Sequence, residues 1–282
     1  GYDMPVQYAG VKQEHQAVRS AAGLFDVSHM GEFELNGDAA GAVIDGLITN
    51  DASKLTDGRA LYTRACNDGG TILDDLIVYR HAPDRWLVVC NASNRDKMVA
   101  HFAAAADGRC SFRDASDETA LIALQGPKAF GVAAQSGGDG AALAELPSFA
   151  LATTTLFGVD VVAARTGYTG EDGVEIFCAA DAAEKLWNAI VAAGEDVGLA
   201  PAGLAARDTL RLEARLSLYG NDIDETTNPL EAGLGWTVKL NKATPFLGQA
   251  ALREIKAAGL SRKLVGFEMR GRGIARQGYP LL

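Results

Sequence analysis

Two apolar stretches joined by a short turn, at residues 71–79 and 85–91, restrict the possible folds of this chain more than any other feature. Both stretches are rich in the β-branched, aliphatic and aromatic residues typical of strands, and the turn between them includes His-Ala-Pro-Asp at residues 81–84. A second strand pair is predicted at residues 161–166 and 174–178, joined by the glycine-rich segment 167–173. Strands joined as hairpins pair antiparallel, so antiparallel sheets are expected.

Segments with helical periodicity lie between these strands. Helices are predicted at residues 11–22, 38–47, 94–106, 181–193 and 203–216. Gly23 is expected to end the first helix. Other strands are predicted at residues 32–35, 118–125 and 263–269, and the Gly- and Ala-rich segment 136–144 is predicted as a loop or linker. Strand pairs that alternate with helices, in place of a run of βαβ units, indicate the α+β class.

Composition narrows the class of function. The net charge of −10 disfavours binding to phosphate backbones, so no nucleic-acid partner is expected. No apolar run reaches the roughly 18 residues of a membrane-spanning helix, and the first residues show no secretory signal. The four cysteines form no CxxC pair and the four histidines no HExxH motif, so free thiols and no metal site are expected.

Asp74 and Asp75 place two successive carboxylates inside the apolar stretch at residues 71–79. Because side chains alternate between faces along a strand, these carboxylates point to opposite sides. An unpaired charge among apolar side chains is costly. Two interpretations fit this pattern: an edge strand with both acids solvated or paired, or a pocket that encloses one carboxylate between apolar and aromatic walls.

The segment at residues 167–175 allows two interpretations as well. It is either a hairpin turn whose glycines adopt positive φ, or a backbone-lined recess from which Tyr168 and Glu175 reach a ligand.

Three arginines, Arg207, Arg211 and Arg215, recur every four residues along the predicted helix at residues 203–216. One interpretation is a solvated face with acidic partners at nearby positions. In the other, one arginine leaves that face and clamps a ligand carboxylate with its planar guanidinium group.

These segments resemble the T-protein (aminomethyltransferase) family of the glycine cleavage system. The matching stretches follow the order of that family along nearly the whole chain. They are AGLFDVSHM at 22–30, GTILDDLIV at 70–78, ALQGP at 123–127, RTGYTGEDGVEI at 165–176, GLAARDTLRLEA at 203–214 and LYGNDIDE at 218–225.

The resemblance implies a three-domain cloverleaf fold with antiparallel sheets flanked by helices. Domain 1 is expected to be discontinuous, at residues 1–32 and 118–230, and to bind folate. Domain 2 is expected at residues 33–117 and to carry the catalytic carboxylate. Residues 231–282 are expected to begin a C-terminal β-barrel domain that is truncated in this chain.

The resemblance also implies a reaction. An aminomethyl group arrives on the lipoyl arm of a partner, the lipoylated H-protein, and tetrahydrofolate accepts the carbon as 5,10-methylenetetrahydrofolate. Ammonia and the dihydrolipoyl H-protein are released. Tetrahydrofolate is a co-substrate here, and neither a metal nor a flavin is required. A membrane partner is not expected.

Site residues follow from the same resemblance. Asp75 matches the essential carboxylate, which would stabilise iminium-like positive charge on the transferred carbon or manage a proton. Glu175 matches the acceptor for the pterin ring, and Arg207 matches a residue that binds the anionic folate tail. Other residues that match folate-lining positions are Met30, Tyr62, Tyr79, Asn91 and Tyr168.

Two alternatives share the implied fold. One is another folate-dependent demethylase, including the folate domain of a sarcosine or dimethylglycine oxidase. The second is a folate-binding factor for tRNA modification or iron–sulfur assembly, whose cysteine-containing motif is absent from residues 203–213. The expected location is a bacterial cytoplasm, or the mitochondrial matrix if the source is eukaryotic.

Overall fold

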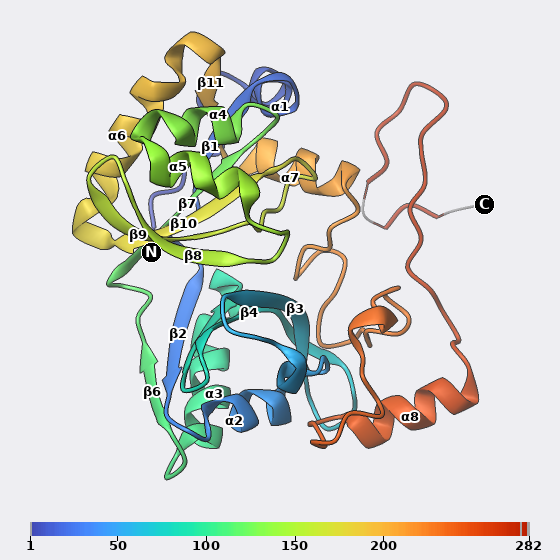
Figure 1. Ribbon diagram of the computed structural model, residues 1–282. Coiled ribbons are helices and arrows are strands. Elements are labelled where there is room, and N and C mark those ends of the chain that lie inside the picture. The colour runs from blue at the N-terminus through green and yellow to red at the C-terminus, as the bar shows by residue number, and fades with distance from the viewer. Residues whose placement is uncertain (1, 277, 281–282) are drawn as a thin grey trace.

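Two sheets organise the computed structural model, which describes residues 2–276 and 278–280 (Figure 1). The first sheet has six strands in the order β11-β1-β7-β10-β9-β8, and its neighbours pair antiparallel except for the short edge strand β11, which pairs parallel with β1. Its strands are β1 (Ala22–Asp26), β7 (Thr119–Gln125), β8 (Leu151–Leu156), β9 (Val159–Ala164), β10 (Gly173–Ala179) and β11 (Leu199–Pro201).

The second sheet has five antiparallel strands in the order β3-β4-β5-β2-β6. Its strands are β2 (Gly31–Asn36), β3 (Arg59–Cys66), β4 (Ile72–Ala82), β5 (Arg85–Cys90) and β6 (Ser111–Asp114). The hairpin predicted at residues 71–91 is confirmed as β4 and β5, and the hairpin predicted at residues 161–178 is confirmed as β9 and β10.

Some of the helices cover one face of each sheet. The α-helices are α1 (Val11–Ser20), α2 (Ala40–Leu47), α3 (Arg95–Ala106), α4 (Ala129–Ala133), α5 (Gly138–Ala142), α6 (Ala183–Gly194), α7 (Leu204–Glu213) and α8 (Gln249–Ala258). Short 3₁₀ helices are η1 (Ala52–Lys54), η2 (Ala92–Asn94), η3 (Ala134–Ser136), η4 (Leu143–Glu145), η5 (Ala180–Ala182), η6 (Glu195–Val197) and η7 (Gly235–Thr237). Within the described residues, no helix is long and apolar enough to cross a membrane.

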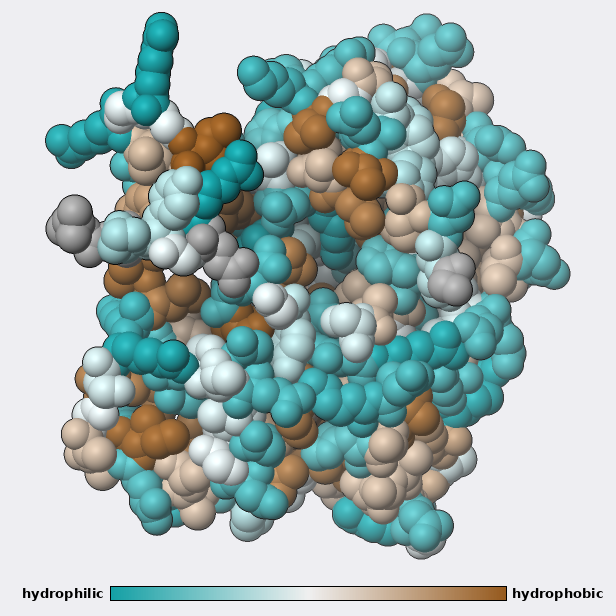
Figure 2. All heavy atoms as spheres, turned by 180° about the vertical axis from the view of Figure 1, so that it is seen from behind, coloured by the Kyte–Doolittle hydropathy of each residue, from teal (hydrophilic) through white to brown (hydrophobic). Residues whose placement is uncertain are grey.

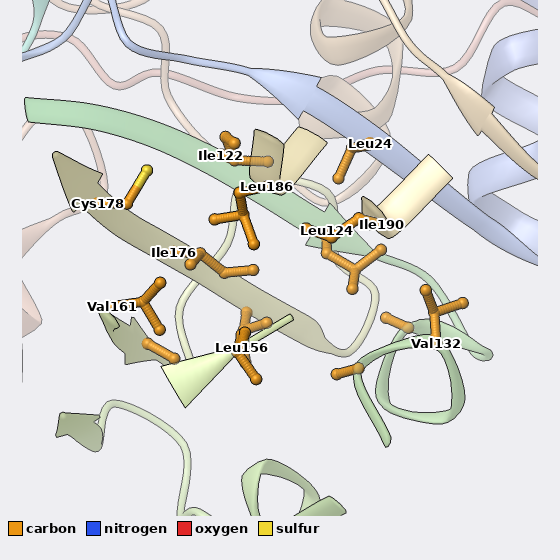
Figure 3. Close-up of a cluster of buried hydrophobic side chains, with 14 of the residues drawn as sticks. Leu24, Ile122, Leu124, Val132, Leu156, Val161, Ile176, Cys178, Leu186 and Ile190 are labelled. Atoms are coloured by element: carbon orange, nitrogen blue, oxygen red, sulfur yellow. The ribbon is translucent and has the colours of Figure 1, made fainter. Parts of the chain in front are cut away.

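Three large apolar layers hold the two sheets and most of the helices together. The first joins one face of the six-stranded sheet to α4 and α6, with Ile176 and Leu186 near its centre (Figure 3). The second joins the five-stranded sheet to α2 and α3. The third lies between the sheets, because it takes Phe25 and Leu121 from one sheet and Val89 from the other. Each fully buried side chain of this size contributes about 1.5–3 kcal/mol.

Gly23 does not end the first helix, which corrects the sequence prediction. Helix α1 ends at Ser20, and Gly23 lies inside β1, paired with Gln125. A Cβ atom at position 23 would lie 2.3 Å from the Cγ2 atom of Val18. The glycine is therefore present because β1 passes directly against α1, a tertiary contact without a local signature.

The prediction of a loop or linker at residues 136–144 is also wrong. This segment forms α5, flanked by the short helices η3 and η4. Its alanines have high helix propensity, and the buried side chain of Leu143 anchors the segment on the first apolar layer. Gly140 lies so close to the backbone of Ala133 that a Cβ atom would be 1.9 Å from that residue's carbonyl oxygen.

The strand predicted at residues 263–269 is absent from the part of the chain that the structure describes. The segment after α8 runs up one side of the molecule without forming a strand (Figure 1), and hydrophobic residues are visible on the surface of the protein from behind (Figure 2). Val265 and Phe267 are more than half exposed. An alternating apolar pattern becomes a strand only where a neighbouring strand pairs with it, and residues 2–276 and 278–280 provide none here.

Candidate active site

A cavity of about 350 Å³ lies between the two sheets and α7. This volume is at the lower end of the range for small-molecule sites, and the walls are mostly apolar. Seven of the eight residues predicted for the site line it: Met30, Tyr62, Asp75, Asn91, Tyr168, Glu175 and Arg207. Residues from distant parts of the chain therefore meet in one place, because the sheets pack face to face around the cavity.

Asp75 lies on β4, which is flanked by β3 and β5, so the edge-strand interpretation of this stretch is wrong. The Tyr62 hydroxyl donates to Oδ2 of Asp75 at 2.7 Å, and the Asn91 amide Nδ2 donates to Oδ1 at 2.7 Å. Burial, and next the charge of Asp75, raise the pKa of Tyr62 well above its usual value. Tyr62 therefore stays a neutral donor to this carboxylate.

Asp74 points to the opposite face of β4 and is completely buried. It accepts hydrogen bonds from the Asn91 backbone N–H at 3.0 Å, from Asn91 Nδ2 at 2.8 Å and from Asn94 Nδ2 at 2.7 Å. Burial, and next the charge of Asp75, raise the pKa of Asp74 to about 7, although the two asparagines oppose this shift.

Glu175 lies on β10 and is 6% exposed. The Thr166 hydroxyl donates to its Oε2 atom at 2.5 Å, and the Tyr79 hydroxyl is 3.5 Å from the same atom. Tyr79 does not line the cavity and is only 1% exposed. The structure therefore places Tyr79 behind the cavity wall, in contact with Glu175.

Arg207 lies on α7 with its guanidinium carbon 4.5 Å from the centroid of the Tyr168 ring. Burial lowers the pKa of Arg207 below its usual value. Among the described residues, no carboxylate lies within ion-pair distance of it. The solvated-face interpretation of the arginine series is therefore wrong at this position, because Arg207 faces the cavity.

The other two arginines differ from Arg207. Arg211 is 4% exposed and forms ion pairs with Asp208 and Asp222, although it also lines the cavity. Arg215 is exposed, as a solvated face requires. The three arginines therefore lie in three different environments, although they recur at the same spacing in the sequence.

His29 is a lining residue that sequence reasoning missed. Burial, and next the charge of Arg207, lower its pKa to about 4, so the imidazole is neutral at physiological pH. Its position directly before Met30 was the available signal, since Met30 was already a predicted lining residue. Within the described part of the chain, no group of three or more His, Cys, Asp or Glu residues is placed to hold a metal ion.

An apolar cavity with carboxylates on two sheets and a guanidinium group on a helix suits an organic ligand with one donor-bearing ring and one anionic end. The fold and this cavity define a two-sheet α+β protein with a cavity of small-molecule size between its sheets.

Comparison with known proteins identifies the family. The family described as "GCVT N-terminal domain" matches residues 1–242. The aminomethyltransferase of Halothermothrix orenii is 49% identical over 281 residues, which are 100% of this chain and 78% of that protein. The aminomethyltransferase of Symbiobacterium thermophilum is 50% identical over 100% of this chain and 76% of that protein. This chain belongs to the aminomethyltransferase family and acts as an aminomethyltransferase.

Solved structures agree with this assignment. The glycine cleavage system aminomethyltransferase T from Bartonella henselae superposes with a TM-score of 0.84 at 37% identity, over 93% of this chain and 71% of that one. A heterotetrameric sarcosine oxidase chain from Corynebacterium sp. U-96 gives a TM-score of 0.51 at 18% identity, over 67% of this chain and 93% of that one. The second likeness concerns the fold alone.

Proposed function

We propose that this enzyme transfers the one-carbon unit of an aminomethyl-lipoyl H-protein to tetrahydrofolate. The products are 5,10-methylenetetrahydrofolate, ammonia and the dihydrolipoyl H-protein. Membership of the aminomethyltransferase family supports this reaction. The observation that carries the proposal to this chain is the ionisable carboxylate of Asp75, which faces an apolar cavity and accepts hydrogen bonds from Tyr62 and Asn91.

Asp75 is proposed as the catalytic residue. The transferred carbon gains positive, iminium-like character as its bond to the lipoyl sulfur breaks, and an anion fixed nearby stabilises that charge. The two donors on Asp75 restrict the rotation of its carboxylate. A carboxylate that is already in place requires little reorganisation energy during the reaction.

The remaining polar residues are proposed to orient tetrahydrofolate. The pterin ring presents N–H donors along one edge, and Glu175 offers a carboxylate whose Oε2 atom is already held by Thr166. The glutamate tail is anionic, and Arg207 offers a positive charge stacked on Tyr168. The separation of an acidic and a basic group within one cavity would fix the direction of the ligand.

Calorimetric titration with tetrahydrofolate tests these roles. Arg207→Ala should weaken binding by about 10- to 100-fold, because a charge-assisted contact contributes about 1.5–3 kcal/mol. Asp75→Asn should keep binding within about threefold yet lose at least about 100-fold in turnover with aminomethylated H-protein. Arg215→Ala is the matched control, because Arg215 is exposed and outside the cavity. Equal binding by the parent and the Arg207→Ala variant would contradict the tail assignment.

The domain boundaries and the location are proposals too. We propose domain 1 at residues 1–32 and 118–230, domain 2 at residues 33–117 and a third domain from residue 231. The division of the strands between two sheets supports the first two. A bacterial cytoplasm is the proposed location, and the bacterial origin of similar aminomethyltransferases supports it.

A further inference from the structure

One side-chain amide links the two consecutive carboxylates of β4. Asn91 Nδ2 lies 2.8 Å from Oδ1 of Asp74 and 2.7 Å from Oδ1 of Asp75. A primary amide carries two N–H bonds, so Asn91 donates one to each carboxylate. The same nitrogen is 3.3 Å from the Asp75 carbonyl oxygen, and this contact keeps the amide close to the strand.

Asp74 decides which way this amide points. A reversed Asn91 side chain would place its carbonyl oxygen against carboxylate oxygens of both Asp74 and Asp75, which is repulsive. With Asp75 alone, a modest rotation would relieve that contact. Asp74 prevents this rotation because it is completely buried and is itself held by the Asn91 backbone N–H at 3.0 Å and by Asn94 Nδ2 at 2.7 Å.

We propose that Asp74 is a positioning residue that acts through Asn91 to hold the Asp75 carboxylate in its catalytic orientation. The inference rests on the proposed function, in which Asp75 is the catalytic residue. Asp74 does not line the cavity, so it acts without touching the substrate. Its loss should therefore lower turnover much more than tetrahydrofolate binding.

Only the ionised form of Asp74 fits this role. Its three partners all donate hydrogen bonds, so a proton on Asp74 would find no acceptor among them. The groups facing it are Asp75 on β4, Cys90 on β5, and Tyr219, whose hydroxyl accepts a hydrogen bond from Lys97. The pKa of Asp74 is raised to about 7, so turnover should fall as the pH drops through neutrality.

A double-mutant cycle on kcat tests the coupling. Asp74→Asn should lower kcat by about 10- to 100-fold, because an asparagine amide offers a single acceptor to three donors and releases Asn91. In an Asn91→Ala background the same substitution should lower kcat by less than about twofold, because the side-chain amide through which Asp74 acts is absent. If the loss in kcat of the double variant equalled the product of the losses in the two single variants, the proposal would be overturned.

A milder variant covers the case in which Asp74→Asn fails to fold. Asn94→Ala keeps both carboxylates and Asn91 but removes one donor that lowers the pKa of Asp74. The acid limb of the kcat profile should then move to higher pH, with KM for tetrahydrofolate within about twofold of the parent. An unmoved acid limb contradicts the inference.

A readout without turnover separates this inference from the proposed function. A parent enzyme inactive with aminomethylated H-protein would refute the function itself. The side-chain amide signals of Asn91 in a ¹⁵N NMR spectrum, assigned by their loss in Asn91→Ala, still report the bridge. In the Asn94→Ala variant, the chemical shifts of these two amide protons should change as the pH falls through the range in which Asp74 takes up a proton. The separation between the two signals should be lost over the same range. If the chemical shifts of these signals did not change over this pH range, the positioning role would be overturned.

Discussion

Individual residues around the cavity owe their chemistry to neighbours that are both near and far in sequence. Tyr62 donates to Asp75 from the adjacent strand, while the guanidinium carbon of Arg64 lies 3.9 Å from the centroid of the Tyr62 ring. The Trp236 ring packs against Tyr62 with centroids 6.1 Å apart. These contacts fix the phenol ring, so the hydroxyl approaches the carboxylate from a constant direction.

Thr166 allows a sharp prediction at this scale. Its hydroxyl donates to Oε2 of Glu175 inside a buried wall, so Thr166→Val removes the donor and keeps the side-chain shape. The Glu175 carboxylate then loses its fixed orientation, and tetrahydrofolate binding should weaken by about 3- to 30-fold, corresponding to a net hydrogen bond of about 0.5–1.5 kcal/mol plus lost orientation. Calorimetry measures this directly.

The control for Thr166→Val is the same substitution at Thr153, which is exposed on β8. Thr153→Val should leave affinity unchanged. An equal loss in both variants would mean that the threonine at position 166 supports the fold and not the ligand.

At the scale of the elements, close contacts between neighbouring elements explain glycines whose roles were predicted wrongly from the local sequence. Gly23 lies where β1 passes against α1, and Gly140 lies where α5 approaches the backbone of the preceding helical segment. In both cases a side chain would occupy space that is already filled by a neighbouring element.

Substitution of two glycines by alanine should therefore have opposite effects on stability. Gly23→Ala introduces a Cβ atom 2.3 Å from a Val18 methyl group, and we expect a loss of about 1–3 kcal/mol in the free energy of unfolding. Gly131→Ala, in the exposed interior of α4 with no heavy atom within 4 Å, should gain about 0.5–1 kcal/mol. Urea denaturation of both variants measures the difference, and a shared sign would refute the packing explanation.

For the whole molecule, the interface between the two sheets contains a buried acid, Glu32. Glu32 alternates on β2 with Phe33, which belongs to the helix-covered layer, so Glu32 faces the other sheet. It is completely buried, and both of its carboxylate oxygens lack a hydrogen-bond partner among the described residues. Burial raises its pKa to about 9, so the folded protein holds Glu32 in its neutral form.

This acid should make stability depend on pH. In the unfolded chain Glu32 ionises near its usual pKa of about 4.3. Keeping its proton in the folded state therefore destabilises the protein increasingly as the pH rises from there towards 9. Glu32→Gln removes the titration, so its stability advantage over the parent should grow by up to about 1.4 kcal/mol per pH unit between pH 5 and 9.

Urea denaturation of the parent and the Glu32→Gln variant at pH 5.5, 7 and 8.5 measures this trend. A constant difference between the two proteins across these pH values would show that Glu32 is already ionised in the folded state. A difference that shrinks with rising pH would reverse the sign of the argument.

The sequence by itself determined the local part of this protein. Both hairpins, the helices α1, α2, α3, α6 and α7, and the α+β class follow from periodicity and turn chemistry, which act over a few residues. The residue pattern alone left Asp75 between two interpretations, and the family resemblance singled it out. The same resemblance named Met30, Tyr168, Glu175 and Arg207, which do meet in one cavity.

Tertiary structure alone decided the rest. Strand alternation places Asp74 and Asp75 on opposite faces, yet it does not reveal that Asn91 reaches both, because that contact depends on how β4 and β5 pack at their ends. Likewise, Tyr79 lies behind the cavity wall and not on it. Such contacts join residues far apart in the chain, and their free energy depends on the packing of whole sheets, which no local pattern encodes.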